Sequence, residues 1–346
     1  MVDLRSDTIS MPTREMLETI LCAKLGDDGR TDEKGRGEDL AVNRLEDLAA
    51  EITGKEAAVL FPSGTQGNTA AVMAWCRPKD KVMVDVMQHI YISEKVLFDP
   101  EIGQMEPVTY QLDAADLPDL TDMERILKEE KIKLVCVENT HNFTGGTCVP
   151  VERMKEIYNL AHSYGVPVHM DGARLFNAAV GLNVTAKEIC RYTDSLMFCI
   201  SKGLGAPVGS LVCGTEEMML KVRAKRKLLG GSMRQAGVIA APGIYALEHN
   251  IRRLSEDHEN AAFTAKQLRD LKHTKIVGTV DSNIIVLDVN DLGLTPSEYC
   301  KRAEEKGLLI KPVLSDKVRL VFYMDIDREK AKEAVEIIRG LDAMKD

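Results

Sequence analysis

Short apolar runs bounded by glycine, proline and polar residues recur through the first two thirds of the chain. Each run has the length of a buried strand, and most are followed by a stretch in which apolar residues repeat at helical spacing. Nearly continuous apolar strands that alternate with helices predict an α/β fold, a mostly parallel sheet with helices on both faces. The predicted strands are Ala57–Phe61, Lys81–Asp85, Leu134–Asn142, Val166–Arg174, Asp194–Ile200 and Ser210–Cys213.

Helical spacing predicts the elements between and around these strands. The first helix begins near Thr13, with Met16 and Leu21 on one apolar face, and it follows an extended polar arm that we expect to pack onto another part of the protein. Another helix begins at Pro150 and ends at Gly165, a residue type that commonly terminates helices. One further helix is expected before the fifth strand.

The pattern changes after the sixth strand. A basic helical stretch leads to a long helix over Gln235–Lys272, in which Pro242 is the candidate break. Three short strands and two helices follow, and the capping box Thr295–Glu298 opens the first of these helices. We therefore expect an N-terminal arm and helix over residues 1–25, a large domain over 26–250 and a small α+β domain over 251–346.

Composition and charge exclude several classes of function. The 346 residues carry a net charge of −9, which disfavours an extended nucleic-acid surface. The apolar runs are too short for a membrane span, and the N-terminus does not resemble a signal peptide. The eight cysteines form no CxxC pair and indicate small core side chains in a reducing cytoplasm. The histidines do not follow a metal-ligand spacing such as HExxH, so no metal site is expected.

Polar side chains follow the carboxyl ends of five predicted strands, where ligands bind in α/β sheets. Lys202 stands between two apolar strands, where burial would favour a nucleophilic amine, although an ordinary loop lysine is the alternative. A Ser-Gly-Thr turn before a helix suits a phosphate, although many such turns bind nothing. The groups at the strand ends are Ser63-Gly64-Thr65, His89, Glu138 with His141, Asp171 with Arg174, and Lys202.

A lysine, a carboxylate and a phosphate site in one place are what pyridoxal phosphate requires of a protein. Lys202 would hold the cofactor aldehyde as a Schiff base, and Asp171 would keep the pyridine nitrogen protonated. The Ser63–Thr65 turn would hold the phosphate, and His89 is a candidate to stack on the ring. Arginines would bind an amino-acid carboxylate with two hydrogen bonds.

Six motifs occur in order along nearly the whole chain, and each alone is unspecific. Together they resemble the L-threonine aldolases, which are fold-type I pyridoxal-phosphate enzymes of the aromatic amino acid β-eliminating lyase/threonine aldolase group. The resemblance implies a fold-type I large domain with a small C-terminal domain. The motifs are Leu4–Thr8, Pro62–Thr65, Glu138–Asn142, His169–Arg174, Ser201–Gly209 and Met233–Gly237.

The resemblance implies a role for each matching residue. Around the cofactor, Lys202 would form the Schiff base, Asp171 would pair with the pyridine nitrogen, His89 would stack on the ring, and Gly64 and Thr65 would bind the phosphate. Around the substrate, Ser6, Arg174 and Arg319 would bind the carboxylate, with Arg174 also beside the cofactor, and His89 or His141 would assist deprotonation of the β-hydroxyl.

The resemblance also implies shared active sites, because Lys227 and Arg234 would enter from a neighbouring subunit. That arrangement requires a homodimer or a homotetramer. The implied reaction is cleavage of L-threonine, L-allo-threonine or a related β-hydroxy-α-amino acid to glycine and an aldehyde. A β-eliminating lyase or racemase on the same scaffold is the alternative within pyridoxal-phosphate enzymes, and an inactive oligomeric binding protein is the alternative outside them.

Three departures from the family pattern lie where the substrate side chain is expected. The polar loop over residues 29–39 is longer than usual, and Arg36 stands where a tyrosine is expected. Ser93 replaces an aromatic residue after the stacking histidine, and Tyr323 replaces a common histidine. An added cation and a lost aromatic ring suggest a larger or anionic β-substituent.

Overall fold

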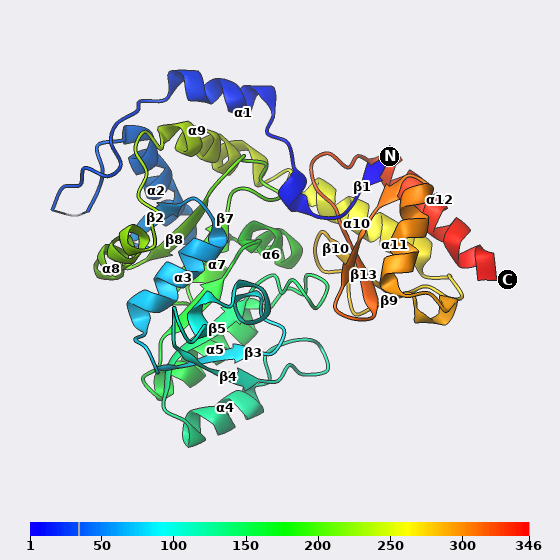
Figure 1. The fold of residues 1–346 in the computed structure, drawn as a ribbon, viewed down its shortest axis with the longest axis horizontal. Helices are drawn as coiled ribbons and strands as arrows, with labels where there is room; N and C mark the ends of the chain where they lie inside the picture. Colours follow the sequence, from blue (N-terminus) through cyan, green and yellow to red (C-terminus); the bar gives the residue numbers. More distant parts are fainter. Residues whose placement is uncertain (34, 346) are drawn as a thin grey trace.

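The computed structural model describes residues 1–33 and 35–345 of the chain. A seven-stranded sheet has the strand order β2-β8-β7-β6-β5-β3-β4 (Figure 1). Strand β8 runs antiparallel to β2 and β7, and the other neighbouring pairs are parallel, so the predicted mostly parallel sheet is confirmed. The strands are β2 Ala57–Phe61, β3 Lys81–Asp85, β4 Glu106–Tyr110, β5 Ile132–Glu138, β6 Val168–Asp171, β7 Ser195–Cys199 and β8 Ser210–Gly214.

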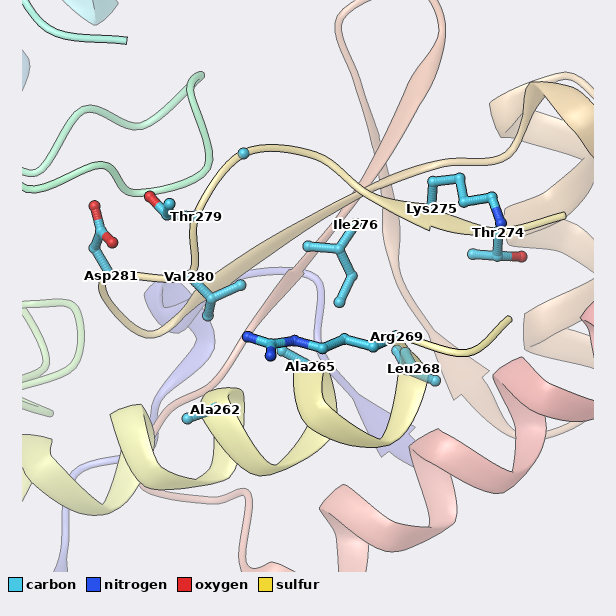
Figure 2. A pocket seen from close by; sticks show the side chains of 11 residues that line it. Ala262, Ala265, Leu268, Arg269, Thr274, Lys275, Ile276, Thr279, Val280 and Asp281 are labelled. Carbon is cyan, nitrogen blue, oxygen red and sulfur yellow. The ribbon is translucent and has the colours of Figure 1, made fainter. Parts of the chain in front are cut away.

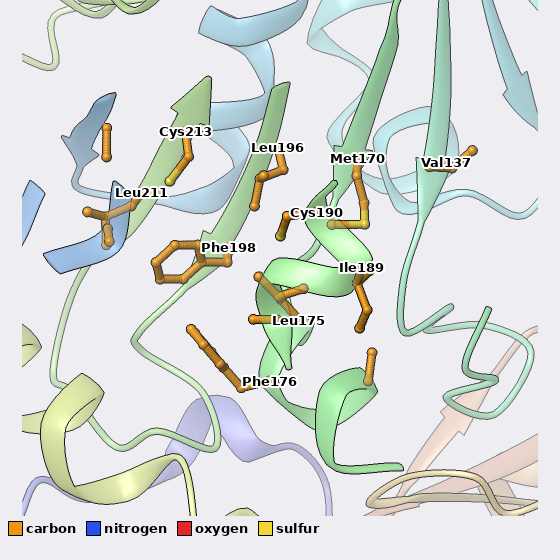
Figure 3. Close-up of a cluster of buried hydrophobic side chains, with 14 of the residues drawn as sticks. Val137, Met170, Leu175, Phe176, Ile189, Cys190, Leu196, Phe198, Leu211 and Cys213 are labelled. Atoms are coloured by element: carbon orange, nitrogen blue, oxygen red, sulfur yellow. The ribbon is translucent and has the colours of Figure 1, made fainter. Parts of the chain in front are cut away.

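Helices cover both faces of this sheet, because successive side chains of each strand point to opposite sides. On one face Phe198 of β7 packs edge-on against Phe176 of α6, with ring centroids 5.2 Å apart (Figure 3). On the other face Met197 of β7 joins a cluster with α3 and α8. The helices are α2 Leu40–Thr53, α3 Gly64–Trp75, α4 Leu120–Glu129, α5 Val151–Ser163, α6 Leu175–Leu182, α7 Ala186–Cys190, α8 Glu216–Leu228 and α9 Gly237–Tyr245.

A second, four-stranded antiparallel sheet forms the C-terminal part, in the order β12-β13-β10-β9. Helix α11 begins with the predicted capping box of Thr295 and Glu298. This part has its own hydrophobic cluster, which also includes Val2 and Leu4, and the division of the chain near residue 250 stays a prediction. The elements are α10 Leu254–Leu268, β9 Lys275–Ile276, β10 Ile284–Asp288, α11 Pro296–Glu305, β11 Leu308–Leu309, β12 Lys311–Val313, β13 Lys317–Val321 and α12 Arg328–Asp342.

The N-terminal arm packs onto this C-terminal part, as its polar sequence suggested. Strand β1 Val2–Asp3 pairs in parallel with β11, and Val2 and Leu4 are fully buried in the C-terminal hydrophobic cluster. Helix α1 Arg14–Glu18 then begins at the side-chain cap of Thr13. A 3₁₀ helix over Thr19–Cys22 follows it, and the predicted apolar face is only partly buried in the single chain, since Met16 is buried but Leu21 is 86% exposed.

The predicted long helix over Gln235–Lys272 is wrong. Helix α9 contains Pro242 without a break and continues into a π-helical turn over Ala246–Asn250, and a new helix, α10, begins at Leu254. A wider turn of this kind commonly accompanies an irregularity inside a helix. The chain therefore passes to the C-terminal part in short segments.

Three further elements were not predicted. Two helices, α6 and α7, stand where one was expected, because Asn183 adopts a left-handed conformation that ends α6, and Thr185 with Glu188 forms a capping box that opens α7. Strand β4 carries Pro107, a residue that weakens a strand pattern and is tolerated at a sheet edge. Helix α4 follows this strand. Among the described residues, none of the helices is long and apolar enough to cross a membrane.

Candidate active site

Lys202 lies in the loop between β7 and β8, the third and second strands in the order of the large sheet. The two strands are buried, whereas Lys202 itself is half-buried. Gly205 and Gly209 give this loop its shape, because both have positive φ angles, of 78° and 123°. Burial raises the pKa of Asp7, but Arg174 and, to a smaller extent, the Lys202 ammonium lower it below its ordinary value.

Asp171 ends the neighbouring strand β6 and is 1% exposed. One carboxylate oxygen accepts the backbone N–H of Ala173 at 3.0 Å, and the other accepts the side-chain amide of Asn68 at 3.0 Å. Because β6 pairs with β7, Asp171 and the Lys202 loop leave the same edge of the sheet. This placement agrees with the predicted shared site.

The Ser63-Gly64-Thr65 turn caps α3, a helix of 12 residues. The Ser63 hydroxyl accepts the backbone N–H of Gln66 at 3.2 Å, and Ser63 and Thr65 are exposed. A side chain at Gly64 would bring its Cβ within 3.0 Å of Cys199 Sγ, so the turn lies directly against the end of β7. Free N–H groups at such a helix start attract an anion.

His89 follows β3 and is held at two points. Its backbone N–H donates to Glu138 at 2.7 Å, and its ring Nδ1 lies 3.1 Å from Glu94. The ring stacks on Phe143, with centroids 6.3 Å apart and an angle of 18° between the planes. Burial opposes protonation of His89, but Glu94, Asp171 and Glu138 together raise its pKa.

His141 follows β5 and is buried. Its Nε2 lies 3.2 Å from both carboxylate oxygens of Asp85, at the end of β3. Its Nδ1 is buried and has no hydrogen-bond partner among the described residues. Burial lowers the pKa of His141, but Glu138 and Asp85 outweigh it and raise that pKa to about 9.

Arg174 and Arg319 come together from the two parts of the chain. Both guanidinium groups donate to the side-chain oxygen of Asn142, at 3.1 and 2.7 Å. Arg174 also forms two hydrogen bonds of 2.7 Å with Asp7. Arg319 Nε is buried without a partner in the described chain, and burial next to Arg174 lowers the pKa of Arg319 to about 10. A substrate carboxylate would satisfy this unpaired donor.

Ser6 precedes Asp7 and therefore lies near this pair of arginines. Its hydroxyl caps a short 3₁₀ turn over Asp7–Ile9 and accepts hydrogen bonds from the backbone and side chain of Thr8, at 3.1 and 2.8 Å. Within the single chain Ser6 thus has a local structural role. Its contact with a substrate carboxylate stays a prediction.

The residues predicted to serve a neighbouring subunit lie on the outer side of the large domain. Lys227 is exposed near the end of α8, and Arg234 is exposed and pairs with Asp27 at 3.1 Å. Arg36 pairs with Asp47 of α2 at 2.7 Å, and its place near the substrate side chain stays a prediction. Residue 34 of the 29–39 loop lies outside the described residues.

Sequence reasoning missed several buried polar residues of the site. Asp7, Asn68 and Asp85 hold Arg174, Asp171 and His141, and Glu94 holds His89. Asp85 ends a predicted strand, so the strand-end rule that identified Asp171 would also have found it. The other three lie in an arm, a helix and a turn, where one sequence offers no comparable pattern.

A separate cavity of about 540 Å³ lies in the C-terminal part, between α10 and β9. Figure 2 shows the Arg269 side chain extending from α10 along this cavity toward Val280. The described residues that line it include none of those predicted for the cofactor or substrate. We therefore place the candidate site at the strand ends around Lys202.

Known proteins are similar to this chain over nearly its whole length. The Beta-eliminating lyase family matches residues 3–291. The low specificity L-threonine aldolase of Escherichia coli K12 is 39% identical over 339 residues, which cover 96% of this chain and 97% of that protein. The low-specificity L-threonine aldolase 1 of Arabidopsis thaliana is 37% identical over 335 residues, covering 94% and 92%.

The fold agrees as well. The solved structure of Leishmania major threonine aldolase superposes with a TM-score of 0.81 at 18% identity, covering 99% of this chain and 100% of that one. This likeness confirms the α/β fold of fold type I. With the family match and the two full-length relatives, it leads to one conclusion: the chain belongs to the beta-eliminating lyase family, in the threonine aldolase group that its motifs indicated.

Proposed function

We propose that this protein is a pyridoxal-phosphate-dependent carbon–carbon lyase that cleaves L-threonine, L-allo-threonine or a related β-hydroxy-α-amino acid to glycine and an aldehyde. The observation that carries the proposal is the convergence of the Lys202 loop, the Asp171 carboxylate and the Ser63-capped helix start at one edge of the sheet. The full-length relatives named L-threonine aldolase give independent support.

The residues at this edge fit the cofactor. Lys202 supplies an amine for the aldehyde, and Asp171 supplies a buried carboxylate for the pyridine nitrogen. The exposed hydroxyls of Ser63 and Thr65 stand with the first N–H groups of α3, which suits the phosphate. When bound, pyridoxal phosphate supplies an electron sink for the charge that develops at Cα.

The other side chains orient the substrate. Arg319, with its unpaired Nε, and Arg174 beside it would bind the carboxylate, and Ser6 would add a hydroxyl. A fixed carboxylate sets which Cα bond stands perpendicular to the cofactor ring, and so which bond breaks. His141 or His89 would receive the β-hydroxyl proton when the Cα–Cβ bond breaks and the aldehyde leaves.

We propose a homodimer or homotetramer in which Lys227 and Arg234 complete the neighbouring site. Exposed leucines support this assembly, since Leu228 beside Lys227 is 75% exposed and Leu21, in the 3₁₀ helix that follows α1, is 86% exposed. The eight free cysteines, most of them buried, suit a reducing compartment, and we propose the cytoplasm.

A panel of β-hydroxy-α-amino acids, incubated with the cofactor-loaded protein, tests the reaction. We expect glycine and an aldehyde from L-threonine or L-allo-threonine, and no product from the Lys202→Ala variant. A 2-oxo acid and ammonia (2-oxobutyrate from threonine, pyruvate from serine) would instead indicate the β-eliminating lyase that the family name suggests, and an inverted amino acid would indicate a racemase. Larger or anionic β-substituents belong in the panel, because Arg36 and Ser93 depart from the family pattern.

A further inference from the structure

A continuous chain of side-chain hydrogen bonds runs behind the candidate site. Trp75 Nε1 lies 2.9 Å from Ser195 Oγ, and Ser195 Oγ lies 2.9 Å from His169 Nδ1. His169 Nε2 lies 3.2 Å from Asn68 Oδ1, and Asn68 Nδ2 lies 3.0 Å from Asp171 Oδ2. Ser195, His169 and Asn68 are completely buried, so solvent does not compete for these bonds.

The chemistry of the groups fixes the direction of every bond in this chain. The Asp171 carboxylate only accepts, so the Asn68 amide donates to it and turns its oxygen toward His169. His169 must then donate from Nε2, which leaves Nδ1 of the neutral ring as an acceptor for the Ser195 hydroxyl. Ser195 in turn accepts from Trp75, which can only donate.

The surroundings of His169 support this neutral tautomer. The ring is fully buried, and burial lowers the pKa of His169 to about 4, so it carries no charge at neutral pH. A charged ring would have to donate from both nitrogens, and the hydroxyl of Ser195 would then lose its role as donor.

Asn68 also connects Asp171 to His89, the candidate to stack on the cofactor ring. Its amide nitrogen lies 3.1 Å from Glu94 Oε1, the same oxygen that lies 3.1 Å from His89 Nδ1. The two N–H groups of one amide therefore serve two carboxylates, one next to His89 and one that is Asp171 itself. The Glu94 side chain is 3% exposed and Asp171 is 1% exposed, so bulk water has little access to either bond.

We propose that Asn68, oriented by His169, Ser195 and Trp75, is the positioning residue that fixes Asp171 and His89 against the cofactor ring. With Asp171 Oδ1 held by Ala173 and Oδ2 held by Asn68, the carboxylate is fixed in one orientation, and its remaining lone pairs would be available to a pyridine nitrogen. The inference rests on the proposed cofactor, and it assigns to the hydrogen-bond chain a role in cofactor binding beyond folding.

The Asn68→Asp variant tests the proposal, because it keeps the side-chain shape and loses the amide donor. Titration of the cofactor-free protein with pyridoxal phosphate should give a dissociation constant about 10-fold to 100-fold higher than wild type, the range expected for a hydrogen bond to a charged group. Asn68→Ala should do the same without adding a charge. The pH midpoint at which the visible absorbance band of the cofactor-loaded protein changes should shift in both Asn68 variants.

Two controls separate positioning from folding. Thr69→Val changes the next buried residue of α3 and should bind the cofactor as wild type does. Trp75→Phe removes only the last donor of the hydrogen-bond chain, so it should raise the dissociation constant for pyridoxal phosphate less than Asn68→Ala does. Circular dichroism should show wild-type folding in all four variants.

The outcomes distinguish this inference from the proposed function. Weaker binding in the Asn68 variants with unchanged Thr69→Val supports it. Wild-type affinity and an unmoved absorbance midpoint in both Asn68 variants overturn the positioning role alone, whereas a wild-type protein that binds no pyridoxal phosphate overturns the proposed function and this role together. An equal loss of cofactor affinity in Thr69→Val and Asn68→Ala would show a general disturbance of α3, and it would also overturn the inference.

Discussion

Asp7 and Arg174 form a two-point ion pair across 167 positions of the chain, with both hydrogen bonds at 2.7 Å. Asp7 is fully buried and the Arg174 side chain is 5% exposed. The pair joins the N-terminal arm to the end of β6, where Asp171 also lies. The arm is therefore a structural part of the candidate site, to which it contributes Asp7 in addition to the predicted Ser6.

Removing the Asp7 carboxylate should destabilise the protein strongly. The Asp7→Ala variant leaves a buried guanidinium without its counter-ion, a change that typically costs about 3 to 5 kcal/mol. Urea unfolding measures the loss, and the KM for L-threonine should rise because Arg174 is no longer held. Asp3→Ala is the matched control in the same arm, since the partly exposed pair of Asp3 with Arg5 should contribute less than about 1 kcal/mol. Equal losses in the two variants would contradict the importance of the buried pair.

The buried pair of Asp85 and His141 should determine the alkaline pH dependence. If neutral His141 receives the β-hydroxyl proton, kcat/KM should rise with pH toward about 9, where the raised pKa of His141 lies. Glu138, Asp85 and Asp116 are the carboxylates that raise this pKa against the effect of burial.

The Asp85→Asn variant removes one of these charges and the direct hydrogen bond to His141. The pKa of His141 should then fall, so the rise in kcat/KM should move to lower pH. Asp116→Asn is the control, because Asp116 contributes least of the three and makes no hydrogen bond with His141 in the described chain. A pH–rate profile that is flat from pH 7 to 9 in the wild type would exclude His141 as the base with this pKa.

Arg319 should contribute more to substrate binding than to turnover. Its Nη1 donates to Asn142 at 2.7 Å, and its buried Nε is free for a ligand in the described chain. Arg319→Lys keeps the charge but loses the two-point geometry, so the KM for L-threonine should rise about 10-fold to 100-fold. Lys317→Ala, two residues earlier on β13, should leave KM near the wild-type value. An unchanged KM in Arg319→Lys would place the carboxylate elsewhere.

The strand-end groups could be predicted because their position depends on short, local patterns. Asp171 and Lys202 each follow an apolar strand, and parallel strands bring such ends together at one edge of the sheet. The partners of these residues could not be predicted in the same way. Asn68 lies inside a helix and meets Asp171 across 103 positions, and Asp7 meets Arg174 across 167, so only the folded chain shows these pairs.

The errors in the fold arise where local geometry overrides the apolar pattern. Helix α9 tolerates Pro242 and is followed by a π turn, which no spacing of apolar residues encodes. The left-handed Asn183 divides a stretch that looks like one helix. In contrast, the capping box at Thr295 was predicted correctly because two side chains three residues apart define it completely.

His169 should make the protein sensitive to mild acid. Burial holds its pKa near 4 in the folded state, against 6.5 for an exposed histidine, so the unfolded chain binds the proton first. Stability should therefore fall as the pH drops from about 6.5 to 4, by up to about 3 kcal/mol. In the cofactor-free protein, His169→Gln should show a shallower loss of unfolding free energy over this range. A wild-type slope in His169→Gln would exclude this histidine as the source of the acid sensitivity.

Shared active sites predict that two inactive variants can restore activity together. Lys202→Ala removes the Schiff-base amine from its own site, and Arg234→Ala should impair only the site of the neighbouring subunit. In a hybrid dimer one site then carries both changes and the other carries neither. Random mixing makes about half of the dimers hybrid, so about a quarter of the wild-type activity should return after the variants are unfolded and refolded together. Refolding each variant alone is the control and should return none of it. If the mixture stays as inactive as Lys202→Ala, Arg234 serves its own subunit, in which it is exposed and pairs with Asp27.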